Sequence, residues 1–216
     1  MRVTWWGKLK ADPDYYVVSV EDTVLYIYGE AVRPSIQSVF LLENTVIAPG
    51  EEVLDIGTGS GIQAIFAART ARRVVATDIG PDAVKSAQYN VQHHGLTSKV
   101  EIRQGDLFAP VRNNEKFDVI INNIDYPEDD ANSPLWEVHR RFFAQVRDYL
   151  TANGRILYQS GSIKNMPLVE QMALDNGLSI VEAHVRQQPA FDKTLVFYVI
   201  HPRPHPEAGT TASPVP

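Results

Sequence analysis

Short apolar segments alternate with helix-like segments along most of the chain, from residue 51 to residue 201. The apolar segments are rich in branched residues, which is typical of strands buried on both faces of a sheet. They lie at 51–57, 73–79, 99–106, 117–123, 154–161, 178–187 and 194–201. The helix-like segments lie at 62–71, 80–95, 133–150 and 164–176. This alternation predicts an α/β fold whose mostly parallel sheet is covered by helices on both faces.

Residues that favour helix ends and turns punctuate these segments. Pro81 suits the first turn of the second helix, and Gly95 suits the left-handed residue that follows it. Ser133 is predicted as the N-cap of the third helix, with Pro134 in its first turn. The last two strands have no helix between them, and they are therefore predicted to form a hairpin.

The N-terminal part of the chain follows a different pattern. Two strand-like segments, 15–20 and 23–28, flank Glu21 and Asp22, and this pattern predicts a β-hairpin. We therefore expect a small extension over residues 1–30, the main domain over 31–202, and a disordered tail rich in Pro, Ala, Ser and Thr over 203–216. The aromatic residues of the extension could form a substrate lid, a homodimer surface or ordinary packing: Trp5, Trp6, Tyr15, Tyr16, Tyr26 and Tyr28.

Composition narrows the classes of function. The 216 residues include no cysteine, which excludes disulfides and thiolate metal sites. No apolar run approaches the roughly 20 residues of a membrane span, and the N-terminus lacks the apolar core of a signal peptide, so we expect a cytoplasmic protein without membrane contact. The net charge of −6 argues against a nucleic-acid partner. Two arginine groups, 69–73 and 140–141, are interpreted as solvated helix faces.

Polar residues gather where the predicted strands end. Asp55 and Asp78 stand at the ends of the first two strands, Asp106 at the end of the third and Asn123 at the end of the fourth. In parallel sheets the carboxyl ends of the strands form the ligand-binding edge. Asp78 could accept hydrogen bonds from ribose hydroxyls or cap the next helix, and Asp106 could bind an adenine amino group or form a simple turn.

The segment "LDIGTGSG" at 54–61 joins a strand to a helix. Its glycines allow a tight turn and the close approach of a ligand, and the following helix offers free N–H groups. The spacing is G-x-G-x-G. The dinucleotide fingerprint would require glycine where Ile62 stands, so a pyrophosphate ligand is disfavoured.

In this order, "VLDIGTGSG", "TDIGPDAV", "GDLF" and "FDVIINNIDY" resemble the motifs of class I S-adenosylmethionine-dependent methyltransferases. The resemblance covers about residues 30 to 200. It implies a Rossmann-like, seven-stranded sheet with an antiparallel last strand, and S-adenosylmethionine as the cofactor. The cofactor contacts that it implies are Asp55, Gly57, Thr58, Gly59, Gly61, Asp78, Ile79, Asp106, Leu107 and Asn123.

The fourth-strand motif is similar to that of the Asn-Pro-Pro-Tyr group, which includes release-factor glutamine methyltransferases and adenine-N6 methyltransferases of nucleic acids. Asn123 falls on the Asn of the motif and Tyr126 on its Tyr, and "RPSIQS" at 33–38 resembles the Arg-Pro segment of the release-factor enzymes. Ile124 and Asp125 replace the two prolines, which removes the rigidity that prolines give and adds a carboxylate.

The expected catalytic residues are therefore Asn123, Asp125 and Tyr126. Asn123 would accept N–H groups of the nucleophile, Asp125 would pair with a cationic amine or take its proton, and Tyr126 would pack over a flat or cationic group. This predicts N-methylation of an amine- or imidazole-like group on a small molecule or peptide side chain.

Several alternatives to this prediction stay open. The substrate could be a protein glutamine or a nucleic-acid base, the reaction could be O-methylation, or the chain could bind the cofactor without catalysis. Asp125 could merely cap a loop. The acidic run 128–130 is interpreted as a solvated loop and not as a metal site, and His93 and His94 are given no catalytic role.

Overall fold

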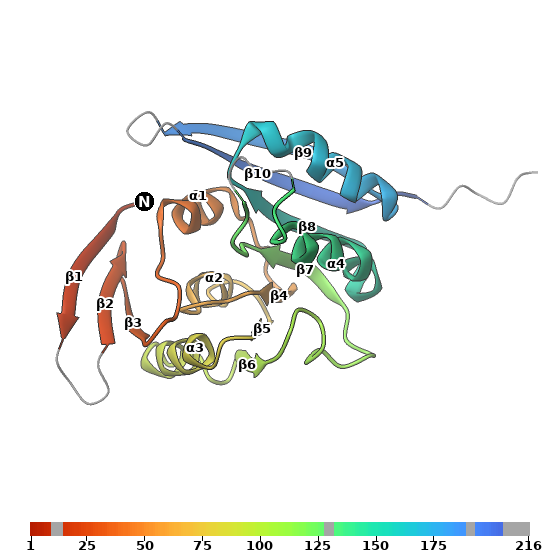
Figure 1. Cartoon of the computed structure of the whole chain (residues 1–216). Coiled ribbons are helices and arrows are strands. Elements are labelled where there is room, and N and C mark those ends of the chain that lie inside the picture. The colour runs from red at the N-terminus through yellow and green to blue at the C-terminus, as the bar shows by residue number, and fades with distance from the viewer. Residues whose placement is uncertain (10–14, 128–131, 189–192, 205–216) are drawn as a thin grey trace, which may run out of the picture.

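The computed structural model describes residues 1–9, 15–127, 132–188 and 193–204. Its main element is a seven-stranded sheet with the strand order β6-β5-β4-β7-β8-β10-β9 (Figure 1). The strands are β4 (Glu52–Ile56), β5 (Arg73–Asp78), β6 (Val100–Gln104), β7 (Phe117–Asn122), β8 (Leu150–Ser160), β9 (Leu178–Gln188) and β10 (Lys193–Pro202). The first five strands of this order run parallel, and β10 pairs antiparallel with both β8 and β9. The predicted sheet with its terminal hairpin is confirmed.

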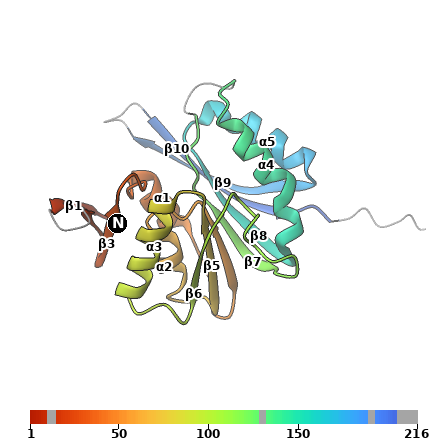
Figure 2. The same cartoon turned by 60° about the horizontal axis from the view of Figure 1, so that its bottom comes forward.

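Helices cover both faces of this sheet (Figure 2). One face carries α1 (Ile36–Asn44), α2 (Ile62–Ala67) and α3 (Pro81–His93). The other carries α4 (Trp136–Val146) and α5 (Met166–Asp175), each next to a short 3-10 turn, η1 (Arg147–Tyr149) and η2 (Ile163–Asn165). In the described part of the chain, no helix is both long and apolar enough to cross a membrane.

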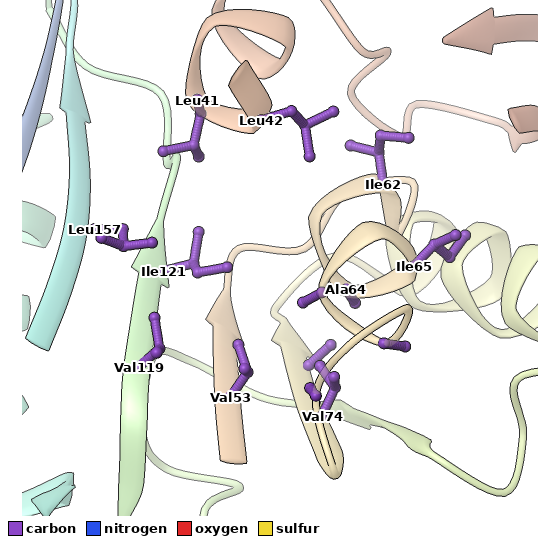
Figure 3. Close-up of a cluster of buried hydrophobic side chains, with 14 of the residues drawn as sticks. Leu41, Leu42, Val53, Ile62, Ala64, Ile65, Val74, Val119, Ile121 and Leu157 are labelled. Atoms are coloured by element: carbon purple, nitrogen blue, oxygen red, sulfur yellow. The ribbon is translucent and has the colours of Figure 1, made fainter. Parts of the chain in front are cut away.

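Alternation along the strands builds a separate apolar core on each face. Val53 of β4 joins Leu41 of α1 and Ile65 of α2 in one cluster, whereas the next residue, Leu54, joins Phe142 of α4 in the other. Figure 3 shows the first cluster, in which side chains of α1 and α2 close over those of the sheet. Because successive side chains point to opposite faces, a strand buried on both sides has to be apolar throughout, as the sequence pattern predicted.

The third predicted helix begins later than expected. Its first residue is Trp136, and the proposed N-cap Ser133 lies in a preceding turn in which its carbonyl oxygen accepts from the Trp136 N–H at 3.1 Å. Leu135, in this turn, is 47% exposed, whereas Trp136 and His139 of the helix are buried. The prediction of Ser133 and Pro134 as the helix start is therefore wrong.

The N-terminal hairpin is confirmed and gains a third strand. β2 (Tyr15–Val20) and β3 (Thr23–Tyr28) pair antiparallel, and β1 (Val3–Leu9), which the sequence pattern did not predict, pairs with β2. The free edge of β3 is held by α3, since Tyr26 N–H donates to Asn90 Oδ1 at 2.8 Å and Tyr28 N–H donates to Ser86 Oγ at 2.9 Å.

The tyrosines of the extension have packing partners in the main domain. Tyr26 lies 5.0 Å from both Tyr89 and His93 of α3, measured between ring centroids, and Tyr15 packs on Tyr26 and Tyr28. This contact accounts for much of the aromatic content through ordinary packing. The lid and the homodimer surface stay predictions, and the side chains of residues 5–9 lie outside the described part of the chain.

Candidate active site

A cavity of about 500 Å³ lies at the carboxyl edge of the parallel strands. Its walls come from the turns after β4, β5 and β6, the loop after β7, residues 30–34 before α1, and two side chains of α4. The volume is within the range of cofactor sites in proteins, roughly 300–1,000 Å³. The cavity therefore lies where the strand ends led us to expect a ligand.

The glycine turn forms the floor of the cavity. Gly57 and Gly59 line it with φ angles of +72° and +56°, values that favour glycine. A Cβ on Gly57 would lie 2.7 Å from Cγ1 of Ile124, so this position also brings the turn against the loop after β7. Gly61 does not line the cavity: a Cβ there would lie 3.2 Å from Ala87 of α3, so this glycine permits close helix packing.

Asp55 supports the glycine turn through a hydrogen bond with Thr58. It is 1% exposed, and its Oδ2 accepts a hydrogen bond from the Thr58 hydroxyl at 2.6 Å. Burial raises the pKa of Asp55 to about 7, with a further increase from the negative charge of Asp78, and the bond from Thr58 opposes the rise. Thr58 lines the cavity and Asp55 does not. The expected cofactor role of Asp55 is therefore indirect in this geometry.

Asp78 accepts two backbone hydrogen bonds next to the cavity, and its expected role toward a ribose stays a prediction. Its Oδ1 accepts from the N–H of Gly80, the residue before α3, at 2.8 Å, and its Oδ2 accepts from the N–H of Gly59 at 2.9 Å. A carboxylate offers about four acceptor positions, so these bonds fix its orientation and leave capacity for a ribose. Ile79, the next residue, lines the cavity with 67% exposure and offers an apolar surface to a flat ring.

The turn after β6 forms the far wall. Asp106 and Leu107 both line the cavity, and Asp106 forms an ion pair with Arg141 of α4. Leu107 has a φ of +48°, an uncommon value for a non-glycine residue, and its carbonyl oxygen accepts from the hydroxyl of Thr77 at 3.2 Å. Strain of this kind is typical of functional turns.

The loop after β7 forms the rim. Asn123, Ile124 and Asp125 line the cavity, and Asp125 is exposed. The side-chain amide of Asn123 donates to Ser38 Oγ of α1 at 3.5 Å. Tyr126 lies elsewhere: a Cβ on Gly161 would be 1.7 Å from its ring, so the ring packs against the chain after β8 and not at the rim. The predicted acidic loop 128–130 lies outside the described residues.

Sequence analysis missed several residues of the site. Arg33, Ser38, Gln63 and Arg141 all line the cavity. For α1, the pair Ser35 and Ser38 was a usable signal, because the two residues form a capping box. The side chain of Ser35 accepts from the backbone N–H of Ser38, and the side chain of Ser38 accepts from the backbone N–H of Ser35. Within the described ranges, no group of three or more His, Asp or Glu side chains is placed to hold a metal ion.

Comparison with known proteins identifies the family. Residues 35–187 match the family model described as ribosomal protein L11 methyltransferase (PrmA). The chain belongs to this family. It is 38% identical over 181 residues to the ribosomal protein L11 methyltransferase of Caldicellulosiruptor bescii, covering 82% of this chain and 53% of that protein. The L11 methyltransferase of Halalkalibacterium halodurans is 33% identical over 183 residues, with coverage of 83% and 53%. The chain thus spans about half the length of these curated relatives.

Solved structures agree on the fold. The ribosomal protein L11 methylase of Lactobacillus delbrueckii subsp. bulgaricus aligns with a TM-score of 0.64 and 24% identity, covering 80% of this chain and 81% of that one. The TYW2 protein of Methanocaldococcus jannaschii, solved in complex with S-adenosylmethionine, aligns with a TM-score of 0.65 and 15% identity, with coverage of 87% and 86%. The matched family is named for a methyltransferase, and S-adenosylmethionine would suit a cavity with a bare glycine backbone, a fixed carboxylate and an apolar wall.

Proposed function

We propose that the chain transfers the methyl group of S-adenosylmethionine to an amine- or imidazole-like nitrogen, on a peptide side chain or on a small molecule. One observation carries this proposal. Asn123 and Asp125, an amide and a carboxylate, stand two residues apart on the rim of the cofactor cavity, and Ile124 between them lies against Gly57 of the cofactor turn. A nitrogen held by the rim would therefore be close to the cofactor.

The cofactor, when bound, supplies a methyl group that its sulfonium already activates. The chain's own residues would bind the cofactor and orient the nitrogen that receives the methyl group. Asp78 would hold the ribose, and Ile79 and Leu107 would enclose the adenine. Proximity and orientation of the nitrogen supply most of the rate in such a transfer. The acceptor side of the site therefore decides which molecule is methylated.

The rim supplies two groups suited to a nitrogen. Asn123 Nδ2 donates to Ser38 Oγ at 3.5 Å, which leaves Oδ1 to accept an N–H of the nucleophile. The carboxylate of Asp125 can pair with an ammonium group or take the proton that an amine must lose before its lone pair can attack. These roles suit an amine better than a neutral amide, whose nitrogen carries no positive charge.

The family favours a peptide side chain over the other acceptors, because the matched relatives are named for a ribosomal protein. Charge argues against nucleic acid. The arginines that could form a basic patch are engaged with acids: Arg69 with Asp22, Arg72 with Glu52, and Arg141 with Asp106. The resemblance to the Asn-Pro-Pro-Tyr group keeps a protein glutamine or a nucleic-acid base as the alternative acceptor, and this alternative stays a prediction.

Replacement of Asp125 by Asn tests the proposal. The variant keeps size and removes the charge, so turnover should fall by about 10²-fold while S-adenosylmethionine affinity stays within about twofold. The assay uses a labelled methyl group with purified ribosomal protein L11 and with cell extract as acceptors. Asp148→Asn, an exposed carboxylate in η1, is the matched control. Equal turnover in the wild type and Asp125→Asn would refute the amine-directed role.

A further inference from the structure

The loop after β7 lacks the two prolines of the motif it resembles, yet its backbone is tied down at three points. The carbonyl oxygen of Asp125 is bonded to Nε2 of His139 at 3.1 Å. The carbonyl oxygen of Pro127 accepts from the side-chain amide of Asn165 at 3.1 Å. The N–H of Ile124 donates to Oδ1 of Asn122 at 3.2 Å. The bonds to Asp125 and Pro127 reach the loop from two other elements, α4 and η2.

The partners of His139 determine its tautomer. A backbone carbonyl only accepts, so Nε2 of His139 carries the proton and donates it to Asp125. Nδ1 is then the acceptor, and the hydroxyl of Tyr158 in β8 donates to it at 2.8 Å. Burial lowers the pKa of His139 to about 4 and raises that of Tyr158 well above its ordinary value. Both groups therefore stay neutral and keep these roles at neutral pH.

Packing fixes the histidine ring and the end of the loop. His139 is fully buried and lies between Trp136, at 5.2 Å between ring centroids, and Tyr158, at 5.7 Å. Beyond Asp125, the ring of Tyr126 fills the space above Gly161, where a Cβ would lie 1.7 Å from a ring carbon. The loop is therefore held from the side facing away from the cavity, while Asn123 and Asp125 face the cavity.

We propose that His139 is a positioning residue for methyl transfer, which holds the backbone of Asp125, and so the rim that receives the nucleophile, in the place of the missing prolines. Tyr158 fixes the tautomer that makes this bond, and Asn165 holds the end of the loop. The effect on transfer rests on the proposed function. The effect on loop order does not, because it follows from the hydrogen bonds alone.

The test compares His139→Phe, which keeps a flat ring and removes the donor, with His139→Gln, whose amide can still donate to Asp125. Amide hydrogen exchange and ¹⁵N relaxation are recorded for residues 122–126 in the full chain with S-adenosylmethionine bound. We expect the amide of Ile124 to exchange at least about tenfold faster in His139→Phe and to recover in His139→Gln. The affinity for S-adenosylmethionine should change by less than about twofold in either variant.

The transfer rate is measured on ribosomal protein L11 and on cell extract with the labelled cofactor. His139→Phe should lower kcat by about tenfold or more with little change in KM, and His139→Gln should restore most of it. Val146→Ala, equally buried on α4 but remote from the loop, controls for general loss of packing. Unchanged loop exchange in His139→Phe, or failure of His139→Gln to recover it, would overturn the proposal.

Two variants keep the test decisive if His139→Phe does not fold. Tyr158→Phe removes the hydroxyl that donates to Nδ1 of His139, and Gly161→Ala places a Cβ against the ring of Tyr126. Both should loosen the loop amides without a matching loss of cofactor affinity, and normal exchange in both would overturn the proposal. If the wild type labels no acceptor, the proposed function fails, and the exchange data still decide whether His139 orders the loop.

Discussion

Asp55 offers the sharpest stability test of the site. The carboxyl group is buried beneath the glycine turn, and burial raises its pKa from the ordinary 3.8 to about 7. Because the folded protein holds this proton more tightly than the unfolded chain does, the folded state loses stability as pH rises between these two values. Below about pH 4 both states are protonated, and above about pH 7 both are ionised, so the loss is confined to that window.

The size of the loss follows from the shift. A shift of about three pKa units corresponds to about 4 kcal/mol of unfolding free energy, at about 1.4 kcal/mol per unit. Asp55→Asn removes the titration, and the Asn carbonyl can still accept the bond from Thr58. The unfolding free energy of Asp55→Asn, minus that of the wild type, should therefore increase steadily from about pH 4 to pH 7 and stay constant above about pH 7.

Urea unfolding of the wild type and Asp55→Asn between about pH 4 and pH 8 measures this difference. The comparison has to be made between the two proteins, because His139 acts in the opposite direction. Burial lowers its pKa from 6.5 to about 4, so its contribution to stability increases as pH rises through that range. That term is common to both proteins and cancels. Parallel stability curves for the two proteins would refute the buried, proton-holding state of Asp55.

Further predictions concern the glycine turn and a remote ion pair. Gly57→Ala should lower S-adenosylmethionine affinity by about tenfold or more in calorimetry, because the new Cβ meets Ile124. Gly50→Ala is the control, since Gly50 also has a positive φ but has open space around it. Equal losses of affinity in the two variants would contradict the clash with Ile124. Glu115→Ala should cost about 2 kcal/mol of unfolding free energy at pH 7, because Glu115 accepts from both Arg103 and Arg73, and its loss leaves Arg103 with Glu101 as its remaining acidic partner. The bond from Arg103 lowers the pKa of Glu115 to about 2, so the cost should shrink as pH falls from about 4.5 toward 2, and a pH-independent cost would argue against the pairing.

Local patterns in the sequence predicted most of the fold. The strands at 73–79 and 117–123 have continuously apolar centres, 74–76 and 119–121, because both faces are buried there, and that property is visible without a structure. The segment 36–44 gave no clear period, since "VFLL" at 39–42 is continuously apolar, and its helix was not predicted. The start of α4 was wrong because a cap residue can equally form a turn before the helix, and only packing of Trp136 decides between them.

The site was predictable as far as it is built from strand ends. Gly57, Asp78 and Asn123 lie at the cavity because the chain direction of parallel strands brings their ends together. The support of the rim was not predictable. His139 and Asn165 lie 14 and 38 residues beyond the carbonyl oxygens that they hold, and nothing local in the sequence marks such a pair. The rigidity that seemed lost with the prolines is supplied by these distant side chains.

The central claim is that the rim at Asn123 and Asp125 directs methyl transfer to a nitrogen of a peptide side chain. The most direct measurement incubates the purified chain with S-adenosylmethionine carrying a labelled methyl group, ribosomal protein L11 and cell extract, and then separates protein, RNA and small molecules. The account predicts base-stable label on an amine nitrogen of the protein fraction, and loss of that label with Asp125→Asn. Label in RNA, label that base removes, or no transfer despite tight cofactor binding would contradict it.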